Sequence, residues 1–114
     1  MSKWRHRLKK MITNELKGVL GLCRRAGKMS LGHDASVEMI KGRKAYLAIT
    51  CSDSSERLKK EIADECSFDN RNIKYIDADF EMKELALTVG SRAGVITVND
   101  RGFAQKLYNL MGGK

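Results

Sequence analysis

Proline is absent from this chain of 114 residues, and cysteine occurs only three times. Cys23, Cys51 and Cys66 are far apart and form no C-x-x-C pair, which argues against a zinc site. An odd cysteine count without an export signal is typical of reduced thiols, so we expect a cytoplasmic location. No apolar run approaches the ~18 residues that a membrane helix needs, and no apolar segment follows the charged N-terminus as in a signal peptide. We therefore expect no membrane partner.

The usual catalytic motifs are missing as well. There is no G-x-x-x-x-G-K-S/T, no G-x-G-x-x-G after a strand and no G-x-S-x-G. His33 is the only histidine outside the N-terminal tail, and no serine or cysteine has an evident base in sequence. Asp77 and Asp79 can be a carboxylate pair, but their spacing fits helix capping better. The sequence predicts a non-enzyme without catalytic residues, metal, cofactor or small-molecule substrate.

Positive charge is what the chain has in excess. It holds 22 Lys and Arg against 14 Asp and Glu, a net charge of +8. Residues 1–10 carry five of the basic residues and no acid, which leaves +3 for the remainder. A basic chain predicts a polyanionic partner. Trp4 lies in this tail, where it stacks on a base, packs on the domain or is incidental to a flexible solubilising arm.

Apolar periodicity predicts strands that alternate with helices. Capping residues mark the helix starts: Thr13, the Asp53-Ser54-Ser55-Glu56 segment, Asp79, and Asn99 or Asp100. Predicted helices cover about 14–26, 34–41, 56–66, 80–89 and 101–110, and predicted strands cover 29–31, 45–50, 73–76 and 94–98. Residues 45–50 show no alternation, so we expect a central strand buried on both faces. This order predicts an α/β fold, a three-layer α/β/α sandwich with a mostly four-stranded mixed sheet, formed by residues 11–114 as one domain.

The segment 28–50 is the most informative for function. Gly32 precedes a helix start, where free N–H groups and the positive helix end favour phosphate or base acceptors. Lys28, Lys41, Arg43 and Lys44 are expected to flank this acceptor-binding helix start. The pattern favours a nucleic-acid partner, although ordinary α/β loops contain it too.

Several segments resemble the kink-turn-binding ribosomal protein superfamily that includes L7Ae and L30e, and above all its small bacterial YlxQ-like branch. The resemblance covers about residues 12–111. Its carriers are Gly27-Lys28-Met29-Ser30-Leu31-Gly32, the IKGRKAYLAI run at 40–49, the helix entry at 52–55 and the segment 84–90. The resemblance implies the same fold and structured RNA, of a kink-turn or rRNA-like kind, as the partner.

The family also implies where RNA binds. In the family, the helix after the glycine reads guanine edges, and the loop before the last strand packs on flipped-out bulge bases. These regions correspond here to residues 32–38 and 90–93. The implied RNA-binding residues, together with the flanking cations, are Lys28, Gly32, His33, Asp34, Ser36, Lys41, Arg43, Gly90, Ser91, Arg92 and Ala93.

The reading helix departs from the family pattern Gly-x-Asn-Glu-x-x-Lys. Asp34 replaces an amide or lysine, Ala35 offers no acceptor for a guanine edge, and Glu38 replaces a lysine. Acidic residues facing phosphates reduce affinity. We expect a ribosomal-type RNA-binding protein, associated with the ribosome, whose kink-turn recognition is weakened or altered. The alternative is a protein-interaction adaptor on the same fold that has lost specific RNA recognition.

Overall fold

The computed structural model describes residues 13–113. The helices are α2 (Asn14–Arg25), α3 (His33–Lys41), α4 (Glu56–Ser67), α5 (Met82–Val89) and α6 (Arg101–Leu110), with a 3₁₀ turn η1 (Phe68–Asn70). The strands are β1 (Met29–Leu31), β2 (Leu47–Thr50), β3 (Lys74–Asp77) and β4 (Val95–Val98). The basic tail and Trp4 lie outside the described residues, so their predicted roles stay predictions. None of the helices within 13–113 is long and apolar enough to cross a membrane.

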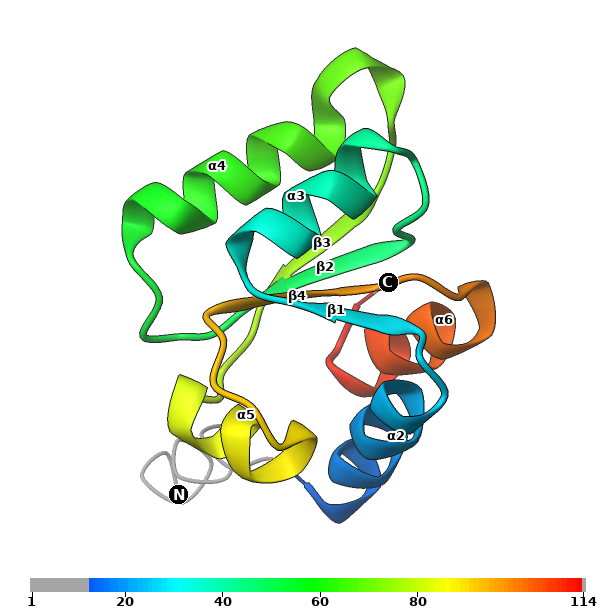
Figure 1. Cartoon of the computed structure of the whole chain (residues 1–114), viewed down its shortest axis with the longest axis vertical. Helices are drawn as coiled ribbons and strands as arrows, with labels where there is room; N and C mark the ends of the chain where they lie inside the picture. The colour runs from blue at the N-terminus through cyan, green and yellow to red at the C-terminus, as the bar shows by residue number, and fades with distance from the viewer. Residues whose placement is uncertain (1–12, 114) are drawn as a thin grey trace.

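The four strands form one mixed sheet in the order β1-β4-β2-β3. β2 runs parallel to β3, whereas β4 is antiparallel to both β1 and β2. Helices α3 and α4 cover one face of the sheet, and α2, α5 and α6 cover the other (Figure 1). The three-layer α/β/α prediction is therefore confirmed.

β2 is one of the two inner strands, together with β4, and all four of its residues are buried. Successive side chains point to opposite faces of a strand, so Leu47 and Ile49 join the core under α2, α5 and α6. Ala48 joins the smaller core under α3 and α4. Each fully buried Leu or Ile side chain contributes about 1.5–3 kcal/mol to stability. The predicted strand was two residues too long, because Ala45 and Tyr46 lie before β2, and Tyr46 has 44% of its surface exposed.

The helix caps follow the predictions at the starts of α2 and α6 and differ at two others, because Ser55 rather than Asp53 caps α4 and Asp79 does not cap α5. Thr13 accepts from the Leu16 N–H, Ser55 from the Leu58 N–H and Asp100 from the Phe103 N–H. Asp79 was expected to cap the fourth predicted helix, but α5 begins only at Met82. The Met82 N–H instead donates to the Asp53 carboxylate, at 2.9 Å, from 29 residues away. Asp53 therefore ties the entry of α4 to the start of α5.

Candidate nucleic-acid interface

The two regions expected to form the RNA site meet at one end of the sheet. β1 and β4 pair antiparallel, with Leu31 opposite Ile96, so the end of β1 lies beside the start of β4. The Gly32 N–H then donates to the Val95 carbonyl at 2.9 Å. This bond places the α3 N-terminus next to the segment that leads into β4 (Figure 1). We call residues 32–38 and 90–93 together the seat.

Gly32 starts α3 in a conformation that suits glycine alone. Its backbone has φ 91° and ψ 170°, a region that side-chain-bearing residues essentially avoid. No side chain caps the helix start. The first N–H groups of α3 are thus free of a side-chain cap, and the helix dipole makes them attractive to an acceptor.

The second half of the seat, residues 90–93, is fixed at its end by hydrogen bonds to the Gly94 carbonyl. Gly90 ends α5 in the left-handed conformation with φ 84°. The Gly94 carbonyl accepts from the Cys51 N–H at 3.0 Å and from the Ser54 hydroxyl at 2.7 Å. Between these anchors, Ser91 and Arg92 are exposed. Arg92 has no carboxylate within 4.0 Å among residues 13–113, so its charge faces solvent.

His33 connects the seat to α4. Its Nδ1 lies 3.0 Å from Asp34 Oδ1, and its Nε2 lies 2.8 Å from Glu61 Oε2. Hydrogen bonding to Asp34, and then to Glu61, raises the pKa of His33 above its ordinary value. A protonated imidazolium between two carboxylates leaves a net negative charge on this part of the seat. Glu61 was missed in the sequence, because nothing in a helix 28 residues downstream marks it as a partner.

Two of the expected contact residues have buried side chains. Ser36 is fully buried in α3, and its hydroxyl has no hydrogen-bond partner among residues 13–113. Ala93 is only 6% exposed and packs in the larger core. Their side chains support the seat from inside, so a direct side-chain contact with RNA does not fit this structure. The helical period explains Ser36, since it lies four residues before the buried Ile40.

The expected flanking cations lie at the other end of the sheet. Lys41 comes eight residues after His33, which at the rise of an α-helix is about 12 Å away. Lys28 precedes β1, whereas Gly32 follows it, a separation of about 13 Å for extended chain. The Arg43 guanidinium bonds the Asp69 carbonyl at 2.9 Å and carboxylate at 3.0 Å. The expectation that these cations flank the seat is therefore wrong; whether they contact RNA remains untested.

The thiols are poorly suited to chemistry. Cys23, Cys51 and Cys66 are free and buried. Burial raises the pKa of the Cys23 thiol to about 11 and those of Cys51 and Cys66 to about 12. Since the thiolate is the nucleophile, these cysteines are inert core residues at neutral pH. In the described part of the chain, no cluster of three His, Cys, Asp or Glu side chains can hold a metal ion.

The fold and the seat define a small three-layer α/β/α protein with a glycine-led helix start beside the loop that enters β4. The model of the ribosomal protein L7Ae/L30e/S12e/Gadd45 family matches residues 14–108, and the chain belongs to this family.

Individual relatives agree with this assignment. The chain is 31% identical over 94 residues to the RNA-binding protein YlxQ of Bacillus subtilis (strain 168), covering 82% of this chain and 91% of that one. It is also 31% identical over 98 residues to the RNA-binding protein YlxQ of Enterococcus faecium, covering 83% and 89%. A solved structure of a protein with unknown function from Bacillus halodurans C superimposes with a TM-score of 0.79 at 27% identity, covering 87% and 98%.

Proposed function

We propose that this chain is a non-catalytic RNA-binding protein of the ribosomal kink-turn-binding type, with weakened or altered kink-turn recognition. The observation that carries the proposal is the meeting of the α3 N-terminus and the β4 entry loop through the Gly32–Val95 hydrogen bond. Family membership and relatives named as RNA-binding proteins support it. A cytoplasmic location and association with the ribosome complete the proposal.

The charges of the seat support weakened recognition. Asp34 and Glu38 are exposed on α3, and Glu61 adds a third carboxylate from α4. His33 offsets part of this charge, while Arg92 is the exposed cation that the second loop offers. A site of this kind gains backbone donors from the helix start but loses affinity by repelling phosphates. RNA shape, rather than phosphate attraction, is then the basis of recognition.

The test is an electrophoretic titration of the full chain against three RNAs. They are a standard kink-turn, the same RNA with its sheared G·A pairs replaced, and a plain duplex. We expect a measurable but modest preference for the kink-turn. In the triple variant Asp34→Asn, Ala35→Glu, Glu38→Lys, the change at position 35 adds a base-edge acceptor. The changes at positions 34 and 38 remove two acids and add one cation. The kink-turn affinity of this variant should rise about tenfold or more, since a good base-edge pair contributes ~1–3 kcal/mol to discrimination.

A matched control separates recognition from charge alone. The triple variant raises the net charge by two, and Asp64→Lys makes the same change on α4, outside the seat. Asp64→Lys should strengthen binding to all three RNAs about equally. If the wild-type chain binds none of them, the adaptor alternative replaces this proposal. If it already selects the kink-turn tightly and the triple variant binds worse, Asp34 and Glu38 are readers in their own right.

A further inference from the structure

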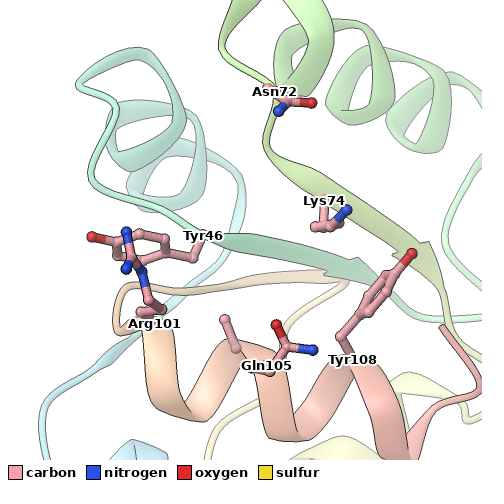
Figure 2. Close-up of a pocket in the computed structure, with 7 residues that line it drawn as sticks. Tyr46, Asn72, Lys74, Arg101, Gln105 and Tyr108 are labelled. Carbon is pink, nitrogen blue, oxygen red and sulfur yellow. The ribbon is translucent and has the colours of Figure 1, made fainter. Parts of the chain in front are cut away.

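A second candidate site lies at the end of the sheet opposite the seat. A pocket of about 230 Å³ opens between the start of β3, the residue before β2 and one face of α6. Figure 2 shows the side chains of α6 rising toward those of Tyr46 and Lys74 across this opening. We call it the tyrosine pocket; its lining includes Tyr46, Asn72, Lys74, Arg101, Gln105 and Tyr108.

Helix periodicity and strand register build the tyrosine pocket. Arg101, Gln105 and Tyr108 recur at helical spacing, so they share one face of α6. Leu107 turns the other way and is fully buried in the core. Lys74 pairs in register with Leu47, which brings it beside Tyr46 at the start of the parallel strands. The Tyr46 N–H donates to the Val98 carbonyl at 2.9 Å and so holds its backbone against β4.

Each tyrosine ring in the pocket is paired with a cation. The Arg101 guanidinium carbon lies 5.9 Å from the centroid of the Tyr46 ring. Lys74 Nζ lies 5.3 Å from the centroid of the Tyr108 ring. None of the described residues that line the pocket is acidic. Among residues 13–113, neither cation has a carboxylate within 4.0 Å, so both charges are available to an anion.

Further cations lie around the pocket. The Lys28 carbonyl accepts from the Asn99 N–H at 2.8 Å, which places Lys28 close to the start of α6. Lys44 lies two residues before Tyr46 and is exposed. Binding sites for single-stranded nucleic acids combine aromatic faces, on which bases stack, with cations that contact the phosphate backbone. The amides of Asn72 and Gln105 add donors and acceptors for a base edge.

We propose that the tyrosine pocket binds a single-stranded RNA segment. One base stacks on the aromatic and guanidinium surface at Tyr46, and the neighbouring phosphates contact Lys74 and Arg101. The volume lies below the about 300–1,000 Å³ of usual small-molecule sites, which favours one base of a strand over a whole enclosed ligand. The inference rests on the proposed RNA-binding function and extends it: the seat contacts a structured RNA, and the pocket contacts an unpaired strand.

The test measures fluorescence anisotropy of a labelled oligouridine of about six nucleotides, a length within the range of known single-strand sites. Tyr46→Leu should weaken binding at least about fivefold, because stacking contributes ~1–3 kcal/mol per base, whereas Tyr46→Phe should keep it. Lys74→Gln with Arg101→Gln should lower the log–log salt slope by about 1.4, at about 0.7 per lost phosphate contact. The matched control, Lys17→Gln with Arg24→Gln, removes the same charge from exposed positions on α2 and should change the slope little.

Other outcomes separate this inference from the proposed function. A compact kink-turn without unpaired ends should bind all the pocket variants as it binds wild type. If the wild-type chain binds oligouridine but no kink-turn, the proposed RNA-binding role of the seat is wrong and that of the pocket is supported. The pocket assignment is overturned if the control pair and the pocket pair weaken oligouridine binding equally. It is overturned too if uridine monophosphate binds as tightly as the oligonucleotide, because the ligand would then be a free nucleotide.

Discussion

The two ends of the sheet differ in charge although the same four strands run through both. Acidic residues gather where β2 and β3 end, around the seat; they include Asp34, Glu38, Asp53, Glu56, Glu61, Asp77, Asp79, Glu81 and Glu84. Cations gather where these strands begin, and Lys28, Lys44, Lys74 and Arg101 lie around the tyrosine pocket. Lys41 lines a separate pocket with Asp64 and Glu65, and Arg43 pairs with Asp69. A net charge of +8 therefore says little about where RNA binds, because the seat, which we propose as one RNA-binding surface, lies at the acidic end.

The two ends also obtain their shape in different ways. The seat depends on backbone conformation: a glycine that starts α3, a left-handed Gly90 and a carbonyl pinned by Ser54. The tyrosine pocket depends on side chains projecting from regular elements, above all from one face of α6. Backbone changes should therefore damage the seat, and side-chain truncations should damage the pocket. Each end can therefore be tested separately by substitutions of these two kinds.

The largest effect on stability is expected for Gly32→Ala. A residue with a side chain in the Gly32 conformation costs about 1–3 kcal/mol, so denaturant midpoints should fall accordingly. Gly18→Ala is the matched control: Gly18 lies in α2 with nothing within 4 Å of an added Cβ, and this variant should gain about 0.5–1 kcal/mol. Oligouridine binding by the folded Gly32→Ala chain should match wild type. Equal losses of stability in both variants would contradict the account of the seat.

A smaller effect is expected for Asp53→Ala. Asp53 accepts from the Met82 N–H in addition to the local Glu81–Glu84 capping box, so its removal should cost about 0.5–2 kcal/mol, as for lost helix caps. Asp79→Ala is the control, since the sequence pattern favoured Asp79 as the cap and the structure does not use it. This control should stay within about 0.5 kcal/mol of wild type in thermal unfolding. A larger loss of stability in Asp79→Ala than in Asp53→Ala would support the original prediction that Asp79 caps this helix.

The smallest effect is the pH dependence contributed by His33. The pKa of His33 is raised in the folded chain, because Asp34 and Glu61 hold its protonated form. The stabilisation is fully present below the unfolded value, about pH 6.5, and is lost as pH rises through the folded pKa. His33→Gln should therefore lose stability against wild type in acid but not in base. An NMR titration of the ring should show a pKa above 6.5, lowered by Glu61→Gln; an unshifted value would refute the ion pair.

The sequence was sufficient wherever structure depends on neighbours along the chain. Thr13 and Asp100 were found as caps because a cap and its N–H partner lie three residues apart. Apolar runs likewise located β2 and β4. Asp53 could not be assigned correctly, because its partner Met82 is 29 residues away and is brought near only by the fold.

The same limit applies to the candidate sites. The two regions of the seat could be proposed because Gly32 has a local signature and the resemblance to the family points to the second loop. The position of Lys28 was misjudged because the three-residue strand β1 separates it from Gly32. The two residues are close in sequence but lie at opposite ends of this strand. Tyr46 gave no signal, since an aromatic beside a buried strand is usually part of the core. Its exposure follows from its place before the sheet begins.

The claim that RNA contacts both the seat and the tyrosine pocket is tested most directly by amide chemical-shift mapping. The labelled full chain is titrated with a kink-turn RNA that carries a short unpaired 3′ extension, and then with the same RNA lacking the extension. We expect the extended RNA to shift the seat, residues 32–38 and 90–93, together with Tyr46, Lys74, Arg101 and Tyr108. The shorter RNA should shift the seat alone. Shifts confined to the seat with both RNAs, or spread over the outer face of α2, would contradict the division between the two ends.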